Sequence, residues 1–125
     1  LNKFFSLHQY ITALSMFNYW TSMKESQDNL NILRKISQKK NITQRKLANE
    51  LGFSLGKLNY CISALKLKGL IKIENFKKNK NKINYIYILT PKGISKKANL
   101  TITFMKKKMK EYEELKKELK KNNEN

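Results

Sequence analysis

Two short helical patterns, each opened by a hydroxyl cap and closed by a glycine, follow one another in residues 43–69. Thr43 caps the first pattern, which ends at Gly52, where a left-handed backbone costs glycine least. Ser54 caps the second, whose apolar residues recur every three or four positions until Gly69. Two helices joined by so short a turn must cross at a steep angle, so the sequence predicts a helix-turn-helix.

After Gly69 the apolar pattern changes from the period of a helix to that of a strand. Residues 70–76 and 83–89 are rich in β-branched and aromatic side chains, and the polar stretch KKNKNK separates them, which predicts a β-hairpin with a basic loop. Thr90 and Pro91 then open another helix, because threonine caps and proline loses no needed hydrogen bond at the first helical position. This order predicts a winged helix-turn-helix, a mostly α fold with a small β-hairpin (α+β).

The outer side of the helix after Ser54 is too polar for a core helix and carries groups that can read duplex DNA. Lys57 can donate to guanine or phosphate, Asn59 can pair with an adenine edge, and Gly56 permits close approach of the backbone. The hairpin lysines suit the DNA backbone or the minor groove, with a solvated loop as the alternative. The predicted DNA-binding residues are Thr43, Gln44, Arg45, Ser54, Leu55, Gly56, Lys57, Asn59, Tyr60, Ser63, Lys77, Lys78, Lys80 and Lys82.

The stretch from Ile42 to about Leu119 resembles the exopolysaccharide-associated branch of the MarR family of transcriptional regulators. The resemblance rests on ITQRKLANELG, SLGKLNYC, KGLIKIENF, YIYILTPKG and KKMKEYEEL, of which SLGKLNYC and LTPKG in this order are specific. It implies a bacterial DNA-binding regulator, similar to proteins encoded among genes for surface polysaccharide synthesis. The chain departs from the wider family in having one long helix after the wing, where larger members build a dimer domain of several helices.

Residues 91–125 predict a helix much longer than the preceding domain needs. No further proline or glycine follows Gly93, which gives about 45 Å from Pro91 to about Lys121 at 1.5 Å per residue. The apolar stripe along it predicts a coiled coil with a second copy. The two winged helix-turn-helix domains, here called heads, would then face half-sites about 34 to 36 Å apart in a pseudo-palindromic operator. The alternative is that the stripe packs back on its own head. The predicted dimerisation residues are Ala98, Ile102, Met105, Met109, Tyr112, Leu115 and Leu119.

The N-terminal residues 1–22 differ in character from the winged helix-turn-helix domain that we place at 23–90. They hold one lysine, no acidic residue and many aromatic residues. Two interpretations stay open: translation naturally starts at Met23, or Phe4, Leu7, Ile11 and Leu14 form one side of an extra helix that packs on the dimer helices. Polar residues interrupt the stretch too often for a membrane span or a signal peptide. Ser26 is the expected cap of a separate first helix of the domain.

Charge favours a polyanionic partner. The 125 residues carry a formal charge of +18 and a pI near 10.0, and residues 23–90 alone hold 15 basic and 4 acidic side chains. Cys61, the only cysteine, excludes an internal disulfide and fits the cytoplasm; it is expected in the core, with a redox role as the alternative. A single histidine, His8, excludes a metal cluster based on histidine, and no cofactor or catalytic motif is present.

Three functions remain open from the sequence. The favoured one is a homodimeric transcriptional regulator that binds double-stranded DNA sequence-specifically; the sequence identifies no small-molecule effector for it. The second is a nucleic-acid binder of low sequence specificity, and the third is a protein-interaction adaptor that uses the winged helix. The salt dependence of binding and the preference for one DNA site discriminate among them.

Overall fold

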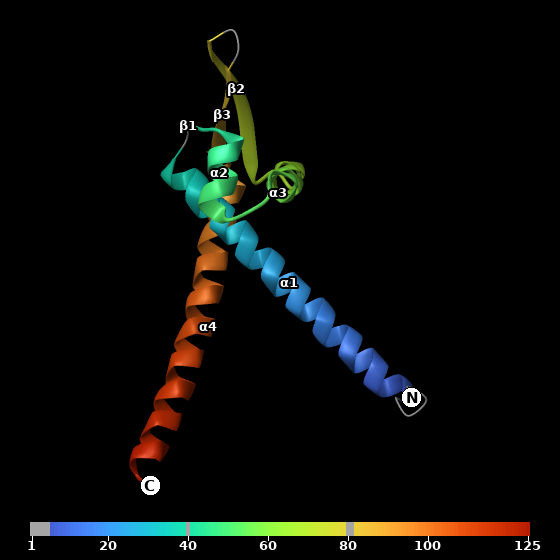
Figure 1. Cartoon of the computed structure of the whole chain (residues 1–125), viewed down its shortest axis with the longest axis vertical. Helices are drawn as coiled ribbons and strands as arrows, with labels where there is room; N and C mark the ends of the chain where they lie inside the picture. The colour runs from blue at the N-terminus through green and yellow to red at the C-terminus, as the bar shows by residue number, and fades with distance from the viewer. Residues whose placement is uncertain (1–5, 40, 80–81) are drawn as a thin grey trace.

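The fold is mostly helical, with a three-stranded antiparallel sheet, a winged helix-turn-helix and a long C-terminal helix (Figure 1). The structure, a computed structural model, describes residues 6–39, 41–79 and 82–125, and the side chains of residues 75–84 lie outside that description. The elements in chain order are α1 (Leu7–Gln38), β1 (Asn41–Ile42), α2 (Gln44–Leu51), α3 (Leu55–Leu67), β2 (Ile71–Asn79), β3 (Lys82–Leu89) and α4 (Pro91–Asn123). The predicted fold class is confirmed.

The caps that the sequence predicts lie at the starts of α2, α3 and α4. The side-chain oxygens of Thr43, Ser54 and Thr90 each accept a hydrogen bond from the backbone N–H three residues later. Gly52 and Gly69 have φ values of 69° and 72°, so both end a helix in the left-handed region. Local backbone chemistry therefore fixes where the helices of the helix-turn-helix begin and end.

The first helix differs from the prediction. Ser26 does not cap a separate helix, because α1 is a single helix that begins after Ser6, where Ser6 and Gln9 form a capping box. No glycine or proline lies between Leu7 and Gln38, so nothing in the chain interrupts the helix at residue 26. Phe4, predicted on one side of an N-terminal helix, lies outside the described residues.

The sheet contains one strand more than the predicted hairpin. The two-residue strand β1 pairs with β3, through Ile42 opposite Tyr85, and gives the strand order β1-β3-β2. The strands β2 and β3 also extend further than predicted, because Lys77 pairs with Ile83 and Lys82 pairs with Asn79; Lys78 lies in β2 at the register shift between these pairs. The basic stretch is thus mainly the end of a two-stranded ribbon, which projects from the head on the side opposite the free ends of α1 and α4 (Figure 1).

The core lies where α1, α2, α3 and the sheet meet. Cys61 is buried, which confirms it as a core residue, and Tyr87 of β3 and Ala48 of α2 are buried with it. The buried set is Leu30, Ile32, Leu33, Ile36, Ile42, Leu47, Ala48, Leu58, Cys61, Ile62, Leu65, Leu70, Ile71, Tyr87 and Leu100. Only the second half of α1 and the first turns of α4 contribute to it.

The remaining halves of α1 and α4 leave the head as two arms. They diverge from one another, and their free ends lie far apart (Figure 1). Both arms expose large apolar side chains, among them Trp20 at 59% and Tyr112 at 62% of their accessible surface. The α4 stripe therefore does not pack back on its own head, and that alternative is wrong. Among the described residues, no helix is both long enough and apolar enough to cross a membrane.

Candidate nucleic-acid interface

The outward face of α3 presents most of the side chains predicted to read DNA. Gly56, Asn59, Tyr60 and Ser63 are exposed on it, and Leu55 at the start of the helix is 41% exposed, whereas Leu58, Cys61, Ile62 and Leu65 face the core. Tyr60 is 73% exposed, so its ring and hydroxyl are accessible to a partner. The face is therefore a ridge of polar groups around one aromatic ring, which suits contact with base edges.

This face extends one turn beyond the predicted residues. Leu67 is 90% exposed, and it follows Tyr60 and Ser63 at helical spacings of seven and four residues. Lys66, Lys68 and Lys72 are exposed close to it in the chain, at the end of α3 and the start of β2. These residues were not predicted, because the polar side of α3 predicted from the sequence ended at Ser63. The spacing from Tyr60 to Leu67 was the signal that could have found them.

Lys57 lies on the flank of α3 and is held by other residues of the chain. Its ammonium nitrogen is 2.9 Å from Asp28 Oδ2 on α1 and 4.1 Å from the centre of the Phe53 ring. An acid on one side and an aromatic face on the other restrain the ammonium group, whose side chain is 39% exposed. The predicted donor to guanine or phosphate is thus directed towards α1, while its neighbours Gly56 and Asn59 face outwards.

The start of α2 supplies a second group of predicted DNA contacts, and these residues differ in how exposed they are and in which other residues they contact. Arg45 is exposed and forms no ion pair with the described residues, and the Thr43 hydroxyl serves as the cap. Gln44 is half-buried beside the Tyr87 hydroxyl. Burial raises the pKa of Tyr87 to about 12, although the nearby Gln44 amide acts in the opposite direction. The Tyr87 hydroxyl makes no hydrogen bond of good geometry with any described residue, so we regard burial as the dominant effect.

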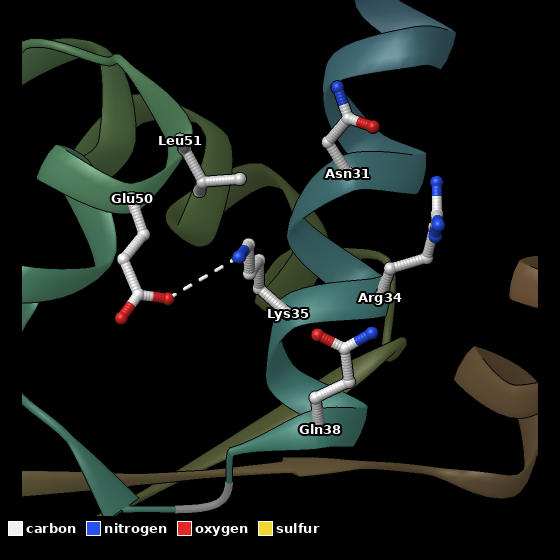
Figure 2. Close-up of a pocket in the computed structure, with 6 residues that line it drawn as sticks. All are labelled: Asn31, Arg34, Lys35, Gln38, Glu50 and Leu51. Carbon is white, nitrogen blue, oxygen red and sulfur yellow. Dashed lines mark ion pairs between the residues drawn. The ribbon is translucent and has the colours of Figure 1, made fainter.

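A polar cleft of about 250 Å³ separates α1 from α2 (Figure 2). Lys35 points across it to Glu50, with 3.4 Å between nitrogen and oxygen, and Lys39 reaches the other carboxylate oxygen at 2.7 Å. The hydrogen bond from Lys39 is the main reason that the pKa of Glu50 lies below its ordinary value, and Lys35 contributes further. Arg34 points away from Glu50 (Figure 2). The cleft joins α2 to α1 by an ion-pair clamp.

The hairpin lysines predicted to grip DNA cannot be placed at the level of side chains. The backbones of Lys77, Lys78 and Lys82 belong to the strands, but their side chains lie outside the described residues, and Lys80 lies outside them altogether. Their role stays a prediction. In the part of the chain that is described, no cluster of three His, Cys, Asp or Glu side chains could hold a metal ion.

The predicted dimerisation residues all lie on the exposed surface of α4. Their exposed fractions run from 46% at Ile102 to 64% at Leu115, and Ala98 is also exposed. Trp20, Met23 and Phe104 line an apolar cleft where α1 and α4 begin to diverge. Apolar side chains are therefore exposed along the α4 stripe, and others line the cleft at the base of the α1 arm.

Comparison with known proteins identifies the fold. Residues 29–72 match a protein-family model described as winged helix-turn-helix DNA-binding. No curated protein sequence matches the chain. Among solved structures, apo ZitR of Lactococcus lactis is 19% identical with a TM-score of 0.56, over 91% of this chain and 83% of ZitR. ZitR is described elsewhere as a zinc-responsive MarR family member.

Two further structures carry ligands. ZitR in complex with DNA is 23% identical with a TM-score of 0.53, over 70% of this chain and 57% of that chain. The PcaV transcriptional regulator from Streptomyces coelicolor, in complex with its natural ligand, is 16% identical with a TM-score of 0.60, over 80% of this chain and 73% of that one. At these identities the likeness concerns the fold: this chain has the winged helix-turn-helix fold of those proteins.

Proposed function

We propose that the protein is a transcriptional regulator of the MarR type that binds duplex DNA sequence-specifically in the cytoplasm. The exposed face of α3 is the observation that carries the proposal. The side chains of Asn59, Tyr60 and Ser63 are exposed there, and they provide groups that can form hydrogen bonds and stack on bases. The match of residues 29–72 to a DNA-binding model and the formal charge of +18 support it. Solved structures of the same fold include a complex with DNA.

The second part of the proposal is that two copies act together on a pseudo-palindromic operator. The apolar stripe of α4 and the apolar α1 arm are exposed in a single chain, and a second copy is the simplest partner that covers both. Two α3 helices would then face half-sites about 34 to 36 Å apart. We also propose surface polysaccharide genes as the targets. This part of the proposal rests only on the resemblance of motifs such as SLGKLNYC and LTPKG to the exopolysaccharide-associated branch of the MarR family.

Selection of duplexes from a random library, followed by binding at several salt concentrations, tests DNA recognition. If six to ten phosphates are contacted, affinity for the selected duplex falls about 10³- to 10⁵-fold between 50 and 200 mM salt. A scrambled duplex of equal composition should bind more weakly at every salt concentration. Equal binding of the two duplexes would favour a nucleic-acid binder of low specificity, and absence of binding to both would favour the adaptor.

Asn59 offers the sharpest single test of the reading face. Asn59→Ala should cost about 1 to 3 kcal/mol on the selected duplex and relax the preference at one base pair, because a bidentate amide contact carries sequence information. Asn99→Ala is the matched control, since Asn99 is also exposed but lies on α4. A loss of the same size on the scrambled duplex would contradict base reading by Asn59.

A further inference from the structure

Ion pairs of opposite polarity join α1 to both helices of the helix-turn-helix. Towards α2, Lys35 of α1 and Lys39, which directly follows α1, supply the cations to Glu50; towards α3, α1 supplies the anion Asp28 to Lys57. Within the described ranges, the Asp28–Lys57 pair is the one polar contact between α1 and α3. Since apolar packing permits small rotations more readily than a directed charge pair does, this pair restrains how α3 lies against α1.

The pair acts on the turn of α3 that begins the reading face. The backbone N–H of Lys57 donates to the Ser54 hydroxyl at 3.1 Å, while its side chain is held by Asp28 and Phe53. The first turn of α3 is thus restrained through its main chain and through a side chain at the same residue. Gly56 and Asn59 on either side of Lys57 inherit that orientation.

Asp28 also occupies a special place along α1. It lies just after the exposed arm and just before the first buried residue, Leu30, within one unbroken helix. Its side chain is 17% exposed, so part of its hydration shell is replaced by Lys57. A rotation of α1 would therefore move the carboxylate that holds α3.

We propose that Asp28 and Lys57 are positioning residues, which set the orientation of the reading face of α3, and that Lys57 makes no contact with DNA itself. The inference rests on the proposed DNA binding. It differs from the usual expectation for a lysine early in a recognition helix, which is a direct contact with guanine or phosphate. The two roles predict opposite effects when the partner Asp28 is neutralised.

The experiment measures affinity for the selected and scrambled duplexes in Asp28→Asn, Lys57→Met and the double variant. Glu25→Gln is the matched control, because it removes the same charge from α1, one turn earlier, at an exposed residue without an ion pair in the described part of the chain. Relative to Glu25→Gln, Asp28→Asn should lower the preference for the selected duplex about tenfold. The double variant should be no worse than either single one, and the salt dependence should be unchanged.

Two results would overturn the inference. If Asp28→Asn binds the selected duplex as tightly as Glu25→Gln or more tightly, the pair does not position α3. If Lys57→Met reduces the slope of log affinity against log salt by about one, Lys57 contacts a phosphate. Failure of the wild-type protein to select any duplex is a different result, because it rejects the proposed DNA recognition before these variants are made.

A charge exchange separates positioning from a general loss of stability. Asp28→Lys and Lys57→Asp, each alone, place like charges together and should abolish the preference, whereas the two combined restore an ion pair. The combined variant should recover a preference for the selected duplex, with circular dichroism confirming that all three variants are folded. A folded combined variant that binds no better than Lys57→Asp alone would also overturn the inference. A pair that only positions α3 should still do so when its two charges are exchanged, whereas a lysine that contacts DNA is lost from residue 57 in this variant.

Discussion

Gly93 is a residue at which the backbone of α4 lies very close to the end of α3 and the start of β2. It is buried, and a Cβ atom added to it would overlap the carbonyl oxygen of Leu70. The Thr90 N–H donates to that same carbonyl at 3.1 Å, so the junction between α3, β2 and α4 is tightly connected. Gly93→Ala should therefore lower the free energy of unfolding by about 1 to 3 kcal/mol, measured by urea denaturation.

Gly56 provides the control for that substitution. It lies in α3 with no atom within 4 Å of an added Cβ, so Gly56→Ala should raise the free energy of unfolding by about 0.4 to 1 kcal/mol by restricting the unfolded chain. Equal changes in the two variants would show that Gly93 is not needed for the close approach.

Cys61 is expected to be chemically inert in the folded protein. Burial raises the pKa of its thiol, and the nearby Asp28 carboxylate raises it further, so the neutral thiol predominates at pH 7. Alkylation by iodoacetamide should be at least tenfold slower in the native protein than in urea, because only the thiolate reacts and the side chain is covered. Equal rates in the two states would instead support a redox role.

Among the elements, α1 and α2 are joined in a manner that depends on pH. Lys39, assisted by Lys35, lowers the pKa of Glu50 in the folded protein, so the clamp stabilises the fold above the ordinary glutamate pKa of about 4.3. That stabilisation is lost as the pH falls through the lowered pKa. Glu50→Gln should thus be less stable than wild type at pH 7, and the difference should shrink at an acid pH below the lowered pKa of Glu50.

Urea unfolding at both pH values measures this difference. Glu113→Gln is the control, since Glu113 is exposed on α4 and forms no ion pair with described residues. A deficit for Glu50→Gln that persists unchanged at the acid pH would mean that shape, and not charge, holds α2 to α1.

The ends of helices and strands were predictable from the sequence where neighbouring residues set them. They were less predictable where pairing or packing with residues distant in the sequence sets them. Thr43, Ser54 and Thr90 cap their helices as predicted because a cap involves only the next three residues. Strand β1 was missed because two residues carry no recognisable period, and it exists only by pairing with β3. The cap expected at Ser26 was wrong because helix continuity outweighs a single favourable cap residue.

The candidate interface shows the same division. Its exposed face followed from the polar side of one helix, which periodicity reveals. The attachment of Lys57 to Asp28 did not follow, because the two residues are distant in sequence and meet only after α1 and α3 pack.

For the whole molecule, exposed apolar surface is the feature that calls for a partner. Met109 is 60% exposed on the α4 stripe, so Met109→Lys should convert a dimer into a monomer by placing a charge in the shared seam. Sedimentation equilibrium measures the mass directly. Thr103→Lys, which adds the same charge to an exposed residue off the stripe, should leave the mass unchanged. A wild-type protein that sediments as a monomer would reject the dimer.

The continuity of α1 has a mechanical consequence. A helix without glycine or proline is a stiff rod, and this rod is gripped by α2 and α3 at one end and free at the other (Figure 1). Because α1 has no hinge, a displacement of its exposed arm would tilt the part of α1 that packs against α2 and α3. A molecule that binds the exposed arm would therefore change the orientation in which the protein presents α3 to DNA.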